Sequence, residues 1–216
     1  MIDKSIKMGY KGTMKKAPEE NKLEKQAVIF DAALKVIREK GFHQARMSDI
    51  AETAGVSYGL VYHYYQNKQS LFDEIFRHWS TNLDDFLDEV IKSPDPLPLK
   101  LKRVIRYFLD TYQEKPDLIH FFITQISRSA PNLTETRLDH FRNLFVLVET
   151  VIRQGQKENL LRSDFEARYL TYSFLGAVEA FLSVMVLGNE KIKSDRQKER
   201  IADFILEVFL NGAKAS

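Results

Sequence analysis

Hydrogen-bonding side chains with almost no formal charge are concentrated between Ser57 and Lys68. Residues 58–64 read YGLVYHY and hold three tyrosines and one histidine but no carboxylate. A free helix face normally carries Lys and Glu, so this composition indicates a surface reserved for contact. Phenol hydroxyls and imidazoles can donate to phosphate oxygens, and side chains at a helix N-terminus can reach base edges in a major groove. The segment therefore fits contact with double-stranded nucleic acid, and burial against a partner protein is the alternative.

Lys68 is a second candidate for anion binding, because it follows Asn67, a predicted helix cap. A cation in the first turn of a helix is disfavoured by the macrodipole by about 0.3–1 kcal/mol. A bound anion would reverse that sign, since free backbone N–H groups and the ammonium would surround it. Lys68 therefore predicts a phosphate site, and a solvated surface lysine is the alternative.

Two short helices, roughly 48–54 and 58–64, must position these side chains. They meet in a three-residue turn that begins at Gly55, the arrangement of a helix-turn-helix. Val61 and Tyr65, four residues apart, anchor the second helix to the core. The residues left on or near its free face are Ser57, Tyr58, Gly59, Leu60, Tyr62, His63 and Tyr64.

Helical segments are predicted over most of the remaining chain. Apolar residues repeat every three or four positions over 23–40, and Gly41 ends that helix. A helix from Asn67 reaches about Lys92, where a proline-rich segment stops it. Five further helical segments are predicted, over about 99–114, 117–129, 134–158, 165–188 and 195–212. The expected fold class is all-α, with about nine helices.

The predicted organisation has three parts. Residues 1–20 form a disordered basic tail, in which Met8 and Met14 are alternative starts. Residues 21–72 form a three-helix, helix-turn-helix DNA-binding domain, and residues 73–216 form a larger helical domain for ligand binding and dimerisation. Residues 1–70 hold 12 Lys and Arg against 8 Asp and Glu, within a whole-chain charge of +2. An anionic partner is therefore expected at the N-terminal third.

The composition argues against an enzyme, a cofactor and a metal centre. The 216 residues include no Cys, which removes disulfides and Cys-ligated metals. The five His show no metal-ligand spacing, and neither a nucleophile motif nor a Gly-rich phosphate loop is present. The first 26 residues hold seven Lys and no apolar run of the signal-peptide type, so a cytoplasmic location is expected.

The segment 169–187 is apolar on nearly every side, and its only charge is Glu179. Its length borders on a membrane span, but its polar residues and the lack of a second span favour a buried helix. One face can cover the helical body, and another needs a partner chain. The last helix is also apolar on two faces. These patterns predict a homodimer with a four-helix-bundle interface.

Residues 28–76 resemble the DNA-binding domain of the TetR family of bacterial transcriptional repressors. An AA helix, a Gly-aromatic stop, DIAETAGVS and GLVYHYYQNKQSLF match in order and spacing. The resemblance implies a homodimer that reads a palindromic operator. It assigns base reading to Ser57, Tyr58, Gly59 and Leu60, and phosphate contacts to Tyr62, His63, Tyr64 and Lys68. The DNA-binding set also includes Ser48 and Arg46; Arg46 stands where the family usually has Thr and cannot cap the helix through its side chain.

In this family the larger domain resembles an effector-binding domain with an apolar cavity. The C-terminal half looks most like the Gram-positive TetR-type regulators of fatty-acid degradation, which respond to long-chain acyl-CoA. Helical periodicity selects the candidate lining, with plain core packing as the alternative: Phe108, Tyr112, Phe122, Gln125, Phe145, Tyr172 and Glu179. Cations for the acyl-CoA phosphates are expected from Lys100, Lys102, Arg103 and Arg106, unless these form a solvated basic face.

Two other functions remain open at this point. A repressor that senses multiple drugs or another hydrophobic ligand would use the same apolar cavity. A helical protein-interaction module would belong to a different class. Salt separates that module from a DNA-binding protein, because DNA binding weakens steeply as salt rises.

Overall fold

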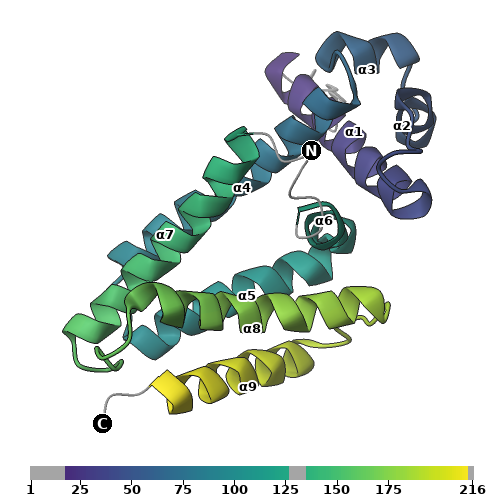
Figure 1. Cartoon of the computed structure of the whole chain (residues 1–216). Helices are drawn as coiled ribbons and strands as arrows, with labels where there is room; N and C mark the ends of the chain where they lie inside the picture. The colour runs from purple at the N-terminus through teal and green to yellow at the C-terminus, as the bar shows by residue number, and fades with distance from the viewer. Residues whose placement is uncertain (1–17, 127–134, 214–216) are drawn as a thin grey trace, which may run out of the picture.

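The computed structural model describes residues 18–126 and 135–213, and helices account for most of them (Figure 1). The helices are α1 (Pro18–Lys40), α2 (Met47–Ala54), α3 (Tyr58–Tyr64), α4 (Lys68–Lys92), α5 (Leu97–Glu114), α6 (Pro116–Phe121), α7 (Glu135–Lys157), α8 (Ala167–Leu187) and α9 (Asp195–Ala213). A short π-helix, η1 (Phe122–Ile126), continues α6. The all-α prediction is confirmed. The helix predicted over 117–129 is divided between α6 and η1, and its last three residues lie outside the described ranges.

Local signals in the sequence set most helix ends. Gly41 and Gly55 adopt left-handed backbones, with φ of 76° and 65°, as helix-ending glycines do. Asn159 also takes this conformation, with φ of 57°, after α7. The N-cap of α4 is Asn67, whose side chain accepts a hydrogen bond from the Ser70 N–H at 2.8 Å. The predicted unstructured tail is wrong at its end, because Pro18–Lys40 is continuous helix and so includes residues 18–20.

Two apolar cores lie along the molecule, and α4 belongs to both. Leu71, Phe72 and Ile75 pack into the core of α1, α2 and α3. One turn farther on, Trp79 contacts both cores, and Leu83 joins the second one. Figure 1 shows α4 running from the N-terminal helices along the body, with α7 beside it. A tilt of α4 would therefore move the N-terminal helices relative to the body.

A second connection between the two cores runs through α6. Leu118 and Phe121 of α6 are buried in the N-terminal core, and the Phe121 ring lies 5.3 Å from the Phe72 ring. The Arg38 guanidinium at the end of α1 donates to Asp117 of α6 at 2.7 Å. It also donates to Asn189, in the turn after α8, at 3.2 Å. The N-terminal helices therefore contact the body through both α4 and α6.

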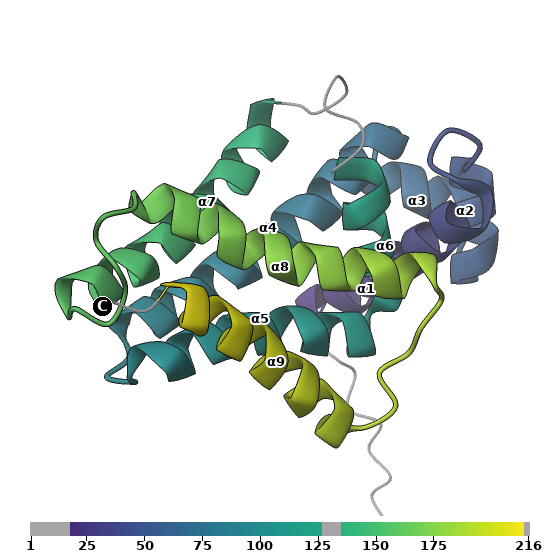
Figure 2. The ribbon, with the colours of Figure 1, turned by 60° about the horizontal axis from the view of Figure 1, so that its bottom comes forward.

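Helices α8 and α9 lie over α5 and α7 (Figure 2). Both helices expose apolar side chains on their outer faces. Phe174 of α8 is fully buried and lies 5.1 Å from the ring of Phe209 of α9. The opposite faces are exposed, including Val184, Phe204 and Val208. Among the described residues, α8 is the one helix long and apolar enough to cross a membrane, and 44% of its most apolar stretch is buried in the body. Core helices commonly reach this composition.

Candidate DNA interface and effector cavity

The helix-turn-helix is formed as its sequence predicts. Ile50 and Ala51 of α2 and Val61 of α3 are buried in the N-terminal core, together with Tyr65 just after α3. The left-handed Gly55 lets its own N–H and that of Val56 donate to carbonyls of the last turn of α2. This turn directs α3 away from α2 and leaves its outer face uncovered.

Two tyrosines dominate the outer face of α3. Tyr58 and Tyr62 are 53% and 40% exposed, and their ring centres lie 4.6 Å apart. A hydrogen bond with Tyr62 is the main cause that raises the pKa of Tyr58 above its ordinary value. The Tyr58 phenol is thus a neutral donor near neutral pH, suited to phosphate oxygens. Gly59 and His63 are also exposed.

Three other residues predicted to contact DNA, one at the N-cap of α3 and two within it, already make contacts inside the protein. Ser57 caps the helix, accepting a hydrogen bond at Oγ from the Leu60 N–H at 3.3 Å. Its hydroxyl proton stays available to an external acceptor. Leu60 and Tyr64 are half-buried, and Tyr64 packs against the N-terminal core. The face offered to a ligand is therefore narrower than the sequence predicts.

The start of α2 exposes Arg46 and Ser48. Arg46 makes no side-chain cap bond, in agreement with the expectation from its chemistry. The side-chain hydrogen bond at this helix start comes instead from Asp49, whose Oδ2 accepts from the backbone N–H of Arg46 at 3.1 Å. Lys40 Nζ lies 3.1 Å from the same oxygen and is the main cause that lowers the pKa of Asp49. Sequence reasoning missed Asp49, although its place three residues after the cap is typical of this bond.

Lys68 is not the free cation that its position predicts. Its ammonium donates to the carbonyls of His43 at 3.2 Å and Ala45 at 3.0 Å, and also to that of Phe42. It lies 4.6 Å from the centre of the Phe42 ring. Burial lowers its pKa. The three donors of the ammonium thus hold the α1–α2 loop against α4, and a phosphate would have to compete for them.

An apolar cavity of about 730 Å³ lies in the body between α4, α7 and α8. Five of the predicted lining residues are there: Phe108, Phe122, Phe145, Tyr172 and Glu179. Sequence reasoning missed the whole contribution of α4: Phe76, Trp79, Ser80, Leu83 and Asp84. Their three- and four-residue spacing marks one face of α4 and could have identified them. The Trp79 and Phe122 rings are 3.9 Å apart in the wall.

Other predicted ligand residues lie elsewhere. Tyr112 is a structural residue, because its hydroxyl donates to the Glu190 carbonyl after α8. Gln125 lies in η1, and its side chain is outside the described part of the structure. Arg103 pairs with Glu89 and with Asp95 at 2.8 Å, and it does not line the cavity.

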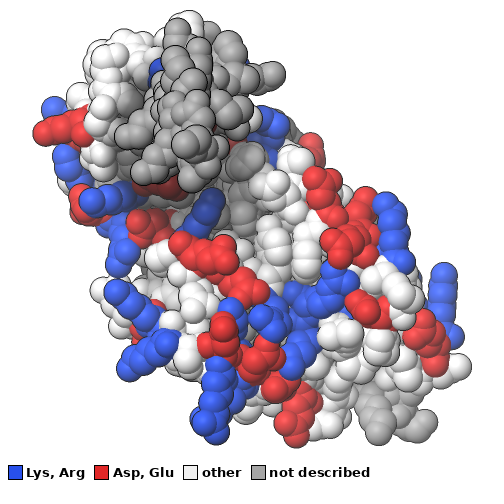
Figure 3. Space-filling view, turned by 180° about the vertical axis from the view of Figure 1, so that it is seen from behind, with Lys and Arg blue, Asp and Glu red and all other residues white. Residues whose placement is uncertain are grey.

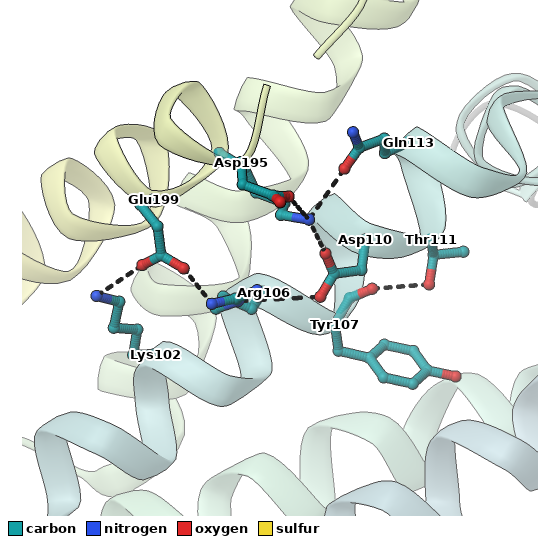
Figure 4. Close-up of polar contacts among 9 residues, drawn as sticks. Lys102, Arg106, Tyr107, Asp110, Thr111, Gln113, Asp195 and Glu199 are labelled. Carbon is teal, nitrogen blue, oxygen red and sulfur yellow. Dashed lines mark hydrogen bonds and ion pairs between the residues drawn. The ribbon is translucent and has the colours of Figure 1, made fainter. Parts of the chain in front are cut away.

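Lys102 and Arg106 of α5 are paired with acidic residues rather than open to a ligand (Figure 4). Arg106 pairs with Glu199 of α9, and Lys102 bridges Glu199 at 2.9 Å and Asp203 at 2.7 Å. Lys100 is buried and donates to the Ile91 carbonyl at 3.1 Å. A phosphate would have to compete with these partners, and a role of these basic residues toward phosphates stays a prediction. Figure 3 shows the molecule from the side opposite to Figure 1. On the face drawn there, Lys and Arg are interspersed with Asp and Glu, and no large area carries one sign of charge.

Comparison with known proteins agrees with this architecture. Residues 29–75 match the family described as bacterial regulatory proteins, tetR family. The fatty acid metabolism regulator protein of Bacillus subtilis is 22% identical over 184 residues, which cover 85% of this chain and 93% of that protein. The HTH-type transcriptional repressor KstR2 of Rhodococcus jostii is 24% identical over 68% of this chain and 72% of its own length.

Solved structures share the fold over nearly the whole chain. FadR from Bacillus subtilis, solved in complex with stearoyl-CoA, superposes with a TM-score of 0.75 at 22% identity, covering 86% of this chain and 98% of that one. FadR from Bacillus halodurans reaches a TM-score of 0.78 at 21% identity, covering 94% of this chain and all of that one. The relatives are transcriptional regulators. The helix-turn-helix of this chain therefore carries the match to the TetR family of bacterial regulatory proteins, and the helical body shares the fold of the FadR structures.

Proposed function

We propose that the protein is a repressor that binds a palindromic operator as a homodimer and is released by a largely apolar effector. The observation that carries the DNA-binding part is the exposed, carboxylate-free face of α3 directly after a helix-turn-helix turn. Ser57, Tyr58, Gly59 and Leu60 would read bases. Tyr62, His63 and Tyr64, with Arg46 and Ser48 from α2, would contact phosphates. The DNA-binding domain proposed is 21–72, and the effector and dimer domain is 73–216.

The DNA-binding proposal is tested by operator selection followed by titration. Duplexes would be selected from a random pool, and affinity measured by fluorescence anisotropy over a range of salt. Tyr62→Ala should weaken operator binding, and Thr53→Ala, exposed on α2 and outside the proposed contact set, should not. A Tyr62→Ala variant with full affinity would contradict the phosphate-contact role.

The exposed apolar faces of α8 and α9 support the homodimer. A groove of about 400 Å³ between them is lined by Phe165, Tyr169, Phe181, Phe204 and Val208, among others. Exposed apolar patches of this kind typically mark protein contacts, and continuous faces on two helices suit a four-helix bundle. Phe204→Glu should convert a dimer to a monomer in analytical ultracentrifugation. A wild-type monomer at micromolar concentration would contradict the two-fold operator model.

The cavity supports the effector part of the proposal. Its volume lies within the usual range for small-molecule sites, and its walls are mostly aromatic and aliphatic. Phe76, Trp79 and Leu83 of its wall sit on α4, the helix that also packs into the N-terminal core. An effector that favours another tilt of α4 would change the separation of the two recognition helices. A shift from 1:99 to 99:1 requires a preference of about 5.5 kcal/mol for the released state.

We propose long-chain acyl-CoA as the effector, on the strength of the FadR–stearoyl-CoA structure with the same fold. The acyl chain would fill the cavity, and the phosphates would remain outside it. Palmitoyl-CoA should release the protein from its operator, and native mass spectrometry of protein expressed in bacteria should find a co-purified acyl-CoA on the dimer. Release by other hydrophobic compounds but not by palmitoyl-CoA would favour the alternative, a repressor that senses several hydrophobic ligands.

The same proposal makes the protein a cytoplasmic regulator without catalytic activity. The relatives are DNA-binding regulators, and α8 has a buried face in the body and an apolar face suited to a partner subunit. A membrane role for α8 would leave the exposed face of α9 unexplained. Fractionation of cells should therefore recover the protein with the cytosol and nucleoid rather than with membranes.

A further inference from the structure

Two carboxylates and no Lys or Arg lie among the described residues that line the cavity. Asp84 and Glu179 bring the two carboxylates to a wall otherwise made of apolar and aromatic groups, His140, Ser80 and the Tyr172 phenol. An apolar cavity with this charge favours ligands that are neutral or cationic over ligands that bring an anion inside.

Asp84 lies in the wall of the cavity, on α4. Its side chain is half-buried, and burial is the main cause that raises its pKa above the ordinary value. A hydrogen bond with Asn143 and the charge of His140, both on α7, act in the opposite direction. In the described parts of the chain, Asp84 has no ion pair with Lys or Arg. Its ionised form is therefore destabilised by burial, and a cation inside the cavity would relieve that cost.

Glu179 is exposed and so lies where the cavity opens to solvent. It accepts a hydrogen bond from the Ser183 hydroxyl at 2.9 Å, one turn along α8. Aromatic rings accompany the two carboxylates in the wall, among them Trp79, Phe145 and Tyr172. The Phe145 and Tyr172 rings are 5.6 Å apart. Faces of such rings attract ammonium groups, and most strongly when water is excluded.

We propose that this cavity binds lipophilic cations, such as an alkyl chain ending in a quaternary ammonium, as a ligand class of its own, with Asp84 and Glu179 as the residues that select the charge. The inference rests on the proposed function, in which the same cavity is the effector site. It is compatible with acyl-CoA, because only the neutral acyl chain of that ligand would enter.

Three probes with the same alkyl chain and different end groups test this inference: decyltrimethylammonium, 1-decanol and decanoate. Trp79 is the single tryptophan of the chain and lies in the cavity wall, so its fluorescence reports binding to the whole protein. The ammonium should bind about tenfold tighter than the alcohol, equivalent to about 1.4 kcal/mol, and decanoate should bind more weakly than either.

The variant Asp84→Asn/Glu179→Gln should bring the affinity of the ammonium to that of 1-decanol while leaving the alcohol unchanged. Asp85→Asn is the matched control, because it removes an exposed carboxylate next to Asp84 that does not line the cavity. Circular dichroism would check that each variant is folded. Equal affinities for the ammonium and the alcohol in the wild type, or a preference that survives the double substitution, would overturn the inference while leaving the effector site standing. Binding of none of the probes and of no palmitoyl-CoA would overturn the effector site as well.

Discussion

Replacing Lys68 with Met should loosen the N-terminal helices before it affects any DNA contact. Methionine keeps an unbranched apolar chain near the Phe42 ring but removes the ammonium that donates to Phe42, His43 and Ala45. Hydrogen bonds from charged donors are each worth about 1.5–3 kcal/mol. The carbonyls lie near the surface, so water can replace part of the loss. We therefore expect the free energy of unfolding to fall by about 2 kcal/mol in total for the three bonds together, which is close to the value of one such bond when no water replaces it.

Urea unfolding followed by far-UV circular dichroism measures this loss. With a slope of about 2 kcal/mol per molar, a loss of that size lowers the midpoint by about 1 M. Lys92→Met is the matched control, because Lys92 is the last residue of the same helix and makes a single exposed pair with Asp88 at 3.5 Å. Such a pair contributes about 0.3–0.5 kcal/mol. A Lys68→Met midpoint no lower than that of the control would refute the structural role of the ammonium.

The salt dependence of operator binding by Lys68→Met separates two roles of Lys68, holding the α1–α2 loop and contacting a DNA phosphate. A lysine that contacts phosphate contributes about 1 to the slope of log affinity against log salt. If Lys68 acts only by holding the loop, the slope should stay at the wild-type value while the affinity falls by a smaller, salt-independent factor. A slope reduced by about 1 would mean that the ammonium leaves the three carbonyls when DNA binds.

Three further predictions concern packing, coupling and pH. Gly155→Ala should destabilise the body by about 1–3 kcal/mol in urea unfolding, because a Cβ there would collide with Leu97 and approach Leu161 Cδ1 to 3.1 Å; an unchanged midpoint would show that Leu97 moves aside without cost. Arg38→Gln removes the bonds from α1 to Asp117 and Asn189, and should reduce the effect of palmitoyl-CoA on operator affinity by about 0.5–2 kcal/mol, measured as the ratio of the two operator Kd values; an unaltered ratio would place the coupling in α4 alone. Burial, and then Arg38, lower the pKa of His120 in the folded protein below the unfolded value of about 6.5, so the unfolded chain binds more protons just below that pH. The contribution of His120 to stability should therefore be present above pH about 6.5 and decline as the pH falls below it, and His120→Gln should reduce the difference in unfolding free energy between acidic and neutral pH.

Local chemistry made much of the DNA-binding unit predictable. The left-handed glycines, the Asn67 cap and the bounds of α3 depend on residues within a few positions of one another. A stop signal or a cap works through the backbone of its own turn, so the sequence around it is sufficient to identify it. The buried anchors Val61 and Tyr65 followed from helical spacing for the same reason.

Contacts between distant segments were decided only by the tertiary structure. Lys68 reaches carbonyls 23 to 26 residues earlier, and Arg106 finds Glu199 across 93 positions. Helical periodicity shows which side chains share a face, but it does not show which element covers that face. For this reason, five aromatic or acidic lining residues were predicted correctly, while the α4 wall and the acidic character of the cavity became visible only when α4, α7 and α8 were packed together.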